Sequence, residues 1–400
     1  MNILVCFYPF PFYRTHGQAL RVYNVFKNIA KNHNVFLLGI SENALNKLEY
    51  NSLLFDAKDI FLKVFRLNIR RKRLLEILSL ITTKYVNLEF PLLKIKLYKI
   101  VWQIIIKYKI DIIYVNGFPF IDLLLSDFTR IPKVLDLCDS RCLIFKRALE
   151  NSSYTLDKII FFLNYFRTKN TEKYLIKKYD ATIFISHIDA SFSANLAKGL
   201  FKIIPNGIDI EYFKPNISIK EEFPSIIFFG TMSFKPNIDA VLYFYKEIFP
   251  KIRKEFPNIR FYVVGTSPIK EILRLKEDRN VIVTGRVDDI RPFVLKTNVV
   301  VIPMRMGSGM KNKILEGMAL QKPVVCTSLA MEALETKCKD VVFVANTPNE
   351  FAEKTVMLLK NEKKRKEIGL KARKVVKEFY SWKKSAEKYC KLFEMLLLKK

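Results

Sequence analysis

The chain has 400 residues, half of them apolar, and a formal net charge of +29. This length favours two domains, and the apolar share supplies two hydrophobic cores, which argues against extensive disorder. No apolar run reaches the ~20 residues that span a bilayer. The first residues, Met1 to Tyr8, predict a strand rather than a signal peptide.

Short apolar runs alternate with longer segments of helical periodicity, which is typical of parallel α/β sheets. The strands predicted in the first half are Ile3–Tyr8, Val35–Ile40, Ile60–Phe65, Asp111–Val115, Lys133–Leu137 and Ala181–Ser186. Helices are predicted over Gln18–Lys31 and Leu92–Lys109. The strands predicted in the second half are Ile226–Gly230, Arg260–Gly265, Val281–Gly285, Asn298–Pro303, Pro323–Thr327 and Val341–Val344.

A turn-rich stretch, Ile204–Asp209, separates the two series of strands and predicts a domain boundary. Residues 1–204 and 205–380 then form two Rossmann-like, doubly wound domains. Residues 381–400 form a last helix whose packing the sequence leaves open. We expect two such domains to face a cleft, with ligands at the carboxyl ends of the strands.

The six cysteines are scattered, with neither metal-ligand spacing nor a dense disulfide framework, which fits a reducing cytoplasm. Cys138 and Cys142 form the one pair that a redox or zinc half-site would use. We favour small core residues as their interpretation.

The most informative segment follows the apolar strand that ends at Pro303. Gly307 and Gly309 bracket Ser308, and a helix begins shortly afterwards. Small residues let a backbone approach a ligand closely, and a helix N-terminus offers free N–H groups and a positive dipole end. These features predict an anion site.

Two lysines strengthen that prediction. Lys311 and Lys313 lie in the first turn of the helix, where acidic residues are preferred. Basic residues in a turn that prefers acidic ones indicate a bound anion that compensates their charge, and a diphosphate is the obvious candidate. Glu316, on the same helix, is suited to accept hydrogen bonds from sugar or ribose hydroxyls. The alternative is an ordinary strand–turn–helix with lysines facing solvent.

The run Gly307–Ala319, followed by Lys322–Val325, resembles the donor-site signature of family-4 retaining glycosyltransferases (glycosyltransferase group 1, GT-B fold). It is most similar to the sugar transferases associated with bacterial exopolysaccharide clusters. Weaker likenesses to that family lie at Gly17 with Arg21, Asp136–Ser140, Pro205–Asp209 with Tyr212–Phe213, Phe229–Met232 with Pro236–Asn237, Val264–Gly265 and Gly285–Val287.

The chain also departs from the family pattern. Of the two donor-site glutamates that members often have, only the second, Glu316, is present, because Ser308 occupies the first position. Thr231 stands where many members have arginine, and Lys235 lies one residue from the expected lysine. The cleft histidine of many members is missing at Cys138 and Asp139, and the histidines lie elsewhere, at His16, His33 and His187.

The resemblance implies an N-terminal acceptor-binding domain and a C-terminal nucleotide-sugar-binding domain. Lys311, Lys313 and the backbone N–H groups near Gly307, Ser308 and Gly309 would then stabilise the leaving diphosphate in place of a metal ion. Glu316 would bind the ribose, Arg286 would lie near the base, and Asp139 would contact the acceptor or sugar hydroxyls. Further contacts to the ligand are expected at Gly17, Gly230, Thr231 and Gly265.

We therefore expect a retaining, metal-independent hexosyltransferase without a cofactor. It would move sugar from a nucleotide-sugar to a glycan or lipid-linked acceptor in bacterial cell-surface polysaccharide synthesis. The alternatives are a sugar-nucleotide epimerase or phosphorylase on the same fold, or a non-catalytic glycan-binding homologue. Nucleic acid is not an expected partner, because no recognised binding module is present.

The positive charge is concentrated between Lys58 and Lys109, where thirteen Lys and Arg residues face three Asp and Glu residues among apolar side chains. Such a segment suits an anionic membrane surface. We therefore expect a cytoplasmic protein at the inner face of the plasma membrane. A solvated basic face combined with compositional drift toward lysine is the alternative.

Overall fold

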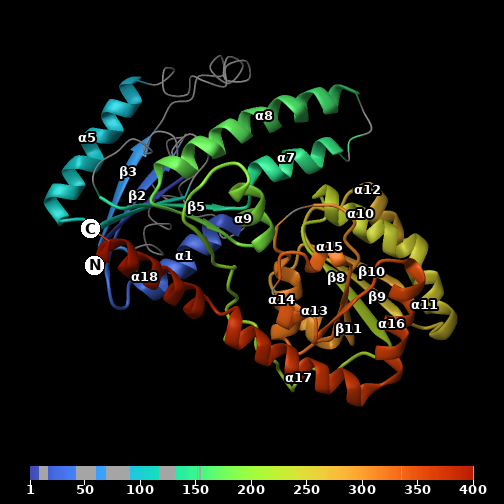
Figure 1. Cartoon of the computed structure of the whole chain (residues 1–400). Coiled ribbons are helices and arrows are strands. Elements are labelled where there is room, and N and C mark those ends of the chain that lie inside the picture. The colour runs from blue at the N-terminus through green and yellow to red at the C-terminus, as the bar shows by residue number, and fades with distance from the viewer. Residues whose placement is uncertain are drawn as a thin grey trace. The chain divides into compact units, whose positions relative to one another are not determined.

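Figure 1 shows the computed structural model of the chain, which describes residues 1–8, 17–41, 60–68, 91–116, 131–150, 152, 155–307, 309–334 and 336–399. The chain divides into two compact units. The first consists of Met1–Ile204 together with Ser385–Lys400, and the second is Pro205–Lys384. The last part of the C-terminal helix thus groups with the first unit.

The first unit is built on a parallel seven-stranded sheet of order β3-β2-β1-β4-β5-β6-β7. Its strands are β1 (Asn2–Phe7), β2 (Asn34–Ser41), β3 (Lys63–Asn68), β4 (Ile112–Asn116), β5 (Lys133–Cys138), β6 (Ala181–Phe184) and β7 (Phe201–Ile203). Every residue of β4 and β5 is buried, as expected for central strands covered by helices on both faces.

Helices cover the two faces of this sheet (Figure 1). Described helices of the unit are α1 (Gly17–Ile29), α5 (Pro91–Tyr108), α7 (Arg141–Glu150), α8 (Thr155–Lys178), α9 (His187–Ala194) and the later part of α18 (Trp382–Leu398). Residues of α5 and α8 pack into one core with Val115 and Leu135. Phe26 of α1 and Tyr389 of α18 instead contact Tyr114, whose side chain points to the other face.

The second unit contains a parallel six-stranded sheet of order β10-β9-β8-β11-β12-β13. Its strands are β8 (Ser225–Phe229), β9 (Arg260–Val264), β10 (Val281–Gly285), β11 (Val299–Ile302), β12 (Val324–Cys326) and β13 (Val342–Val344). The chain adds strands outward in one direction from β8 and then in the other from β11. The direction therefore reverses between these two neighbouring strands.

The helices of the second unit alternate with its strands. They are α10 (Lys235–Tyr243), η1 (Phe244–Ile248), α11 (Phe249–Glu255), α12 (Lys270–Leu273), η2 (Arg274–Glu277), α13 (Arg291–Lys296), α14 (Asn312–Ala319), α15 (Ser328–Met331), η3 (Thr336–Cys338), α16 (Pro348–Lys360) and α17 (Glu362–Phe379). Sequence signals fix some of their ends. For example, Thr347 and Glu350 form a capping box before α16, with Pro348 at its first position.

The predicted strands of the second unit agree with the observed ones to within one residue at each end, and the larger differences lie in the first unit. Phe201–Ile203 forms a strand that the sequence did not indicate, because it has three residues at an edge of the sheet and all are only half-buried. Strand β3 begins at Lys63 rather than Ile60. Ile60 and Phe61 are buried just before it, which explains the apolar signal.

The two-sheet architecture confirms the predicted fold class, two doubly wound Rossmann-like domains. All six cysteines are free, and five of them are buried. Across the ranges given above, every helix falls short of the length and apolar character that crossing a membrane requires.

Candidate functional site

The predicted donor-site residues of the second unit gather where its strand order reverses. Gly230 directly follows β8, and residues 303–311 connect neighbouring β11 to α14. Open parallel sheets bind ligands outside the carboxyl ends of their strands at such a reversal point. The topology of this unit therefore predicts a ligand site at the same place as the sequence motif does.

Two glycines bring backbones together at this point. A Cβ atom on Gly265 would lie 1.7 Å from the carbonyl oxygen of Gly230, so no side chain fits there. A Cβ atom on Gly230 would lie 2.9 Å from Nδ2 of Asn237 and 3.2 Å from Nζ of Lys313. Both glycines have positive φ angles, of 151° and 153°. Glycine at position 230 leaves room for Lys313 beside the end of β8, and glycine at position 265 leaves room for the backbone of Gly230.

Lys313 is a partly buried lysine that has a neutral hydrogen-bond partner. Its Nζ donates to Oδ1 of Asn237 at 2.7 Å and lies 4.5 Å from the ring centre of Phe228. Burial lowers the pKa of Lys313 to about 8, with Glu316 opposing the change and Lys311 adding to it. The lysine is thus held in a place that disfavours its charge.

Glu316 lies one turn further along α14. Burial raises its pKa to about 7, and the positive charge of Lys313 opposes that change. Within the described part of the chain, Lys313 and Glu316 form no ion pair with each other or with other residues. The inward residues Ile314, Leu315 and Met318 are buried as predicted and fix the helix that carries both groups.

The loop before α14 presents further polar groups. Gly307 has a φ angle of 99°, and Nζ of Lys311 donates to the carbonyl of Gly309 at 3.1 Å. Oδ1 of Asn312 is buried and has no hydrogen-bond partner among the described residues. A buried acceptor without a partner is costly in a folded protein and marks a place where a ligand donor would fit. Ser308 lies outside the described residues.

The remaining predicted residues of this unit are more peripheral. Thr231 is exposed, and its carbonyl accepts a hydrogen bond from Nδ2 of Asn237 at 2.8 Å. Arg286 is also exposed and follows Gly285, whose φ angle is 75°, at the end of β10. Strand β10 is the edge of the sheet, two strands from β8, so the structure does not bring Arg286 together with Lys313.

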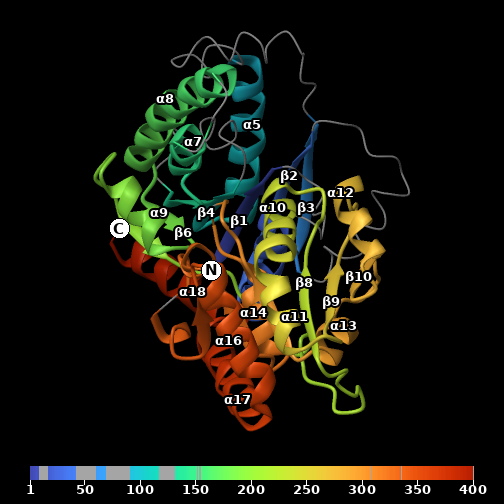
Figure 2. The ribbon, with the colours of Figure 1, turned by 90° about the vertical axis from the view of Figure 1, so that its right-hand side faces the viewer.

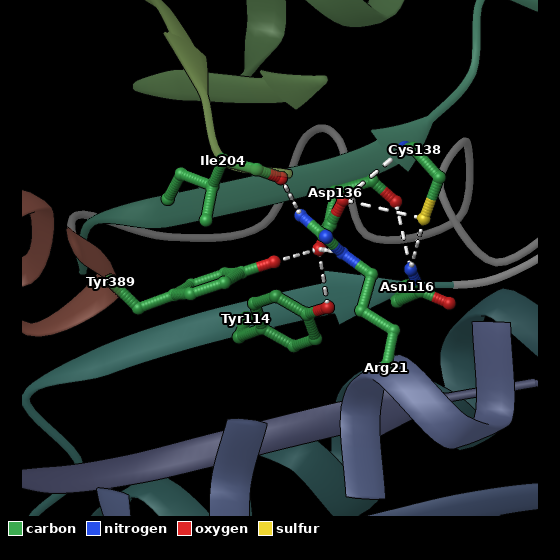
Figure 3. Close-up of polar contacts among 7 residues, drawn as sticks. All are labelled: Arg21, Tyr114, Asn116, Asp136, Cys138, Ile204 and Tyr389. Atoms are coloured by element: carbon green, nitrogen blue, oxygen red, sulfur yellow. Dashed lines mark hydrogen bonds and ion pairs between the residues drawn. The ribbon is translucent and has the colours of Figure 1, made fainter. Parts of the chain in front are cut away.

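The first unit contains a different cluster of charges, shown in Figure 3. Nε of Arg21 donates to Oδ2 of Asp136 at 2.9 Å, and its Nη2 donates to the carbonyl of Ile204 at 2.8 Å. The same carboxylate oxygen accepts from the hydroxyl groups of Tyr114, at 2.8 Å, and Tyr389. Both charged side chains are almost fully buried.

The end of β5 is held in place by this cluster. The amide of Cys138 donates to Oδ1 of Asp136 at 3.2 Å, and Cys138 has a positive φ angle of 62° where the pairing of β5 with β6 shifts register. Burial, together with the charge of Asp136, raises the pKa of the Cys138 thiol well above its ordinary value. A neutral, buried thiol is a structural group rather than a reactive one.

Asp139 follows directly, with its amide donating to the carbonyl of Leu137 at 2.9 Å. The next residue, Ser140, donates from its hydroxyl to buried Glu172 at 2.9 Å and from its amide to Asp189 at 2.9 Å. Hydrogen bonds of its own amide and of the neighbouring Ser140 therefore fix the backbone at Asp139. Gly17 is the first residue of α1, and a Cβ atom built on it would meet no atom of the described residues within 4 Å, apart from its chain neighbours and the backbone of its own helix.

Residue-by-residue reading missed two groups of the second unit and one of the first. Asn237 binds Lys313 across 76 positions of the chain, and only its place in a family motif drew attention to it. Asn312 has no signal in the sequence that sets it apart from an ordinary polar residue between two lysines. Tyr389 stands at an apolar position of the helical spacing in the last helix, yet its hydroxyl contacts Asp136. Within the ranges that the structure describes, no three His, Cys, Asp or Glu residues gather as metal ligands would.

Comparisons with known proteins indicate the class of protein to which the fold is similar. Residues 223–361, all in the second unit, match the family model described as Glycosyl transferases group 1. The whole chain superposes on sucrose-phosphate synthase from Thermosynechococcus elongatus with a TM-score of 0.71 at 14% identity, covering 100% of both chains. The Anabaena protein HepE in complex with UDP gives a TM-score of 0.67 at 17% identity, covering 99% of this chain and 100% of that one. The fold is thus of the GT-B type, and it supports a glycosyltransferase together with the family model.

Two sequence relatives were compared, and the first of them is named for the same class. An uncharacterised glycosyltransferase of Methanocaldococcus jannaschii is 27% identical over 59% of this chain and 63% of its own length. An uncharacterised 44.6 kDa protein in the cps region of Klebsiella pneumoniae is 22% identical over 63% of this chain and 66% of its own. The chain thus spans just under two thirds of the length of these relatives.

Proposed function

We propose that the chain is a retaining glycosyltransferase that uses a nucleotide-sugar donor. The observation that carries the proposal is the pair of half-buried charged groups, Lys313 and Glu316, at the strand reversal of the second unit. Burial pulls the pKa of each toward neutrality, which is a cost that an anionic, hydroxyl-rich ligand would offset. Solved structures of this fold include one with UDP and one with UDP-glucose.

In this proposal the nucleoside diphosphate leaves the anomeric carbon of the donor sugar, and the oxygen of the acceptor hydroxyl bonds to that carbon on the same face. The hydroxyl proton passes to the departing diphosphate. Negative charge develops on the departing diphosphate. Lys313, Lys311 and the N–H groups of the loop before α14 stabilise that charge. Glu316 accepts hydrogen bonds from the ribose, and Asn312 offers a further acceptor. Thr231, Arg286, Gly17 and the acceptor contact Asp139 complete the proposed set.

The test is to incubate the purified chain with a panel of nucleotide-sugars and to follow release of nucleoside diphosphate with and without candidate acceptors. We expect one donor to be turned over well above the others. Release from none of them, together with no binding of any donor, would contradict the proposal. An epimerised sugar-nucleotide or a sugar 1-phosphate as product would identify the epimerase or phosphorylase alternative, and binding of glycan without turnover the non-catalytic one.

We also propose that the reaction needs no divalent metal, because the lysines and helix N–H groups take the place of the cation. Activity should therefore persist in excess EDTA. Loss of activity that magnesium or manganese restores would instead assign the leaving-group chemistry to a metal ion.

For location we propose the inner face of a bacterial plasma membrane, where a lipid-linked acceptor would be presented. The support is the basic, apolar segment Lys58–Lys109. Part of this segment, including Arg70–Arg73, lies outside the described residues. Substituting those four residues by serine should weaken binding to anionic liposomes, and the binding should fall as salt rises.

A further inference from the structure

Helix α8 (Thr155–Lys178) carries a run of apolar side chains that face solvent. Six large ones are between 43% and 70% exposed: Leu156, Ile159, Ile160, Phe162, Leu163 and Phe166. Monomeric soluble proteins rarely expose a contiguous apolar patch of several large side chains. Such a patch marks a contact surface. The rings of Phe162 and Phe166 contact each other in a tilted arrangement, with ring centres 4.7 Å apart.

The exposed residues share one side of the helix. At about 100° per residue, these six positions fall within an arc of roughly 160°. Leu175 lies on the opposite side and belongs to the core of the unit, as does Tyr179 directly after the helix. Glu172 is buried on that side too. Helix α7 packs alongside α8, as Figure 2 shows. The inward face therefore anchors the helix in the unit, while the outward face is exposed and available for a binding partner.

The outward face changes character along its length. After Phe166 it continues with basic residues: Arg167, Lys173, Lys177 and Lys178. Over the whole helix six basic residues face two acidic ones, and one of these, Glu172, is buried. Lys169 lies at the flank, 6.0 Å from the ring centre of Phe166. One side of α8 is thus apolar over its first turns and basic over its last.

We propose that this outward face of α8 docks on an anionic lipid bilayer, with the helix lying in the plane of the interface. The apolar side chains enter the boundary between head groups and acyl chains, and the lysines contact acidic head groups. The helix does not cross the bilayer, in keeping with its charges. Docking would place the first unit, which carries Asp139, at the membrane surface.

Charge decides between a bilayer and a second copy of the chain. Each copy carries +29, and joining two α8 faces would bring their lysines together and desolvate them. An anionic bilayer instead offers an apolar layer and negative charge side by side, which matches the two halves of the face. A fluid surface also fits a convex helix without needing a complementary groove.

This inference is separate from the proposed reaction and from the segment Lys58–Lys109, because binding to lipid is measured without substrate and the variants differ. The experiment uses the full chain and sedimented vesicles of phosphatidylcholine alone or mixed with phosphatidylglycerol. The apolar variant combines Phe162→Ser, Leu163→Ser and Phe166→Ser. The charge variant combines Lys173→Ser and Lys177→Ser. All five positions are exposed, so both variants should fold, which circular dichroism checks.

We expect the chain to bind the mixed vesicles and not the neutral ones. The apolar variant should lose about tenfold or more in partitioning. The charge variant should lose about fivefold per lysine at low salt, and this loss should shrink as salt rises. The matched control is Leu370→Ser on basic helix α17 of the second unit, where Leu370 is 59% exposed. It should bind like the parent chain.

A second readout locates the contact. A tryptophan introduced by Leu163→Trp should be quenched by brominated lipid, whereas one introduced by Leu370→Trp should not. Equal vesicle binding by the parent chain and the apolar variant would overturn the proposal, as would no binding by either. A parent chain that dimerises in solution and an apolar variant that does not, with neither bound to vesicles, would assign the face to self-association instead.

Discussion

Each unit holds two opposite charges on buried or partly buried side chains, and the two sets are built differently. In the first unit Asp136 accepts hydrogen bonds from Arg21, Tyr114 and Tyr389, so its charge is fully matched within the protein. In the second unit the hydrogen-bond partner of Lys313 among the described residues is the neutral Asn237, and burial lowers the pKa of Lys313 to about 8. A matched charge needs nothing further, whereas an unmatched one is stabilised when a ligand of opposite charge arrives.

This contrast separates a structural role from a binding role. Buried groups that are paired and hydrogen-bonded hold elements together, here α1, β4, β5 and α18 around one carboxylate. Buried groups with shifted pKa values and incomplete partners gather at binding and reaction sites. The pair on α14 fits the second description, and that is why we place the donor there rather than at the more conspicuous cluster of the first unit.

The largest expected effect comes from breaking the matched pair. Arg21→Met leaves the Asp136 carboxylate buried without its cation, which should lower the free energy of unfolding by about 3–5 kcal/mol. Urea denaturation followed by circular dichroism measures this. The double variant Arg21→Met with Asp136→Leu should recover part of the loss, because no lone charge is left buried. A single variant as stable as the parent chain would show that the pair is not structural.

The opposite result is expected for the unmatched lysine. Lys313→Ala should lower the efficiency of donor use about ten- to hundredfold, from the loss of one charge-assisted contact of roughly 1.5–3 kcal/mol. It should cost little stability, because the buried charge was itself unfavourable. Lys311→Ala should act in the same direction, equally or more mildly.

Lys322 supplies the matched control for this comparison. It is a buried lysine just after α14, but its Nζ pairs with Oε1 of Glu221 at 2.6 Å. Lys322→Ala should therefore reduce stability and leave donor use unchanged. If Lys313→Ala and Lys322→Ala behave alike in both measurements, the distinction between matched and unmatched lysines fails.

The pH dependence of donor use provides a third, smaller effect. The binding form needs Lys313 protonated and Glu316 ionised, with pKa values of about 8 and about 7. The ratio kcat/KM for the donor should rise with pH up to about 7 and fall above about 8, up to tenfold per pH unit on each side. The two limbs report the pair as a coupled system.

Substitutions tell the limbs apart. Lys313→Arg keeps the positive charge at all these pH values and should remove the fall above about 8. Glu316→Gln removes the titrating carboxyl and should remove the rise up to about 7. A profile that keeps both limbs in both variants would assign the titration to other groups.

Sequence reading succeeded where the signal was local. Strand β11, the glycines after it and the amphipathic helix α14 follow one another within about twenty residues, and periodicity with glycine placement reveals them. It failed where contacts join distant parts of the chain. Asn237 meets Lys313 across 76 positions and Tyr389 meets Asp136 across 253, and neither residue type distinguishes such a contact from an ordinary polar position. The roles assigned to the site residues stay predictions.

The smallest effect we expect is also the most specific. Asn237 is buried, and its amide bridges Nζ of Lys313, at 2.7 Å, and the carbonyl of Thr231, at 2.8 Å. It thus positions the lysine beside the end of β8 without needing to touch the donor. Asn237→Ala removes one hydrogen bond to a charged group and should lower kcat/KM for the donor about five- to tenfold.

A merely structural role for Asn237 would not move the pH profile, and this separates the two explanations. Asn237→Asp places a carboxylate against the lysine, which favours its charged form and should shift the alkaline limb above its starting value of about 8. Asn237→Ala removes an acceptor that favours the charged form, so the same limb should shift downward. Variants that change activity while the alkaline limb stays in place would show that Asn237 acts through packing rather than through Lys313.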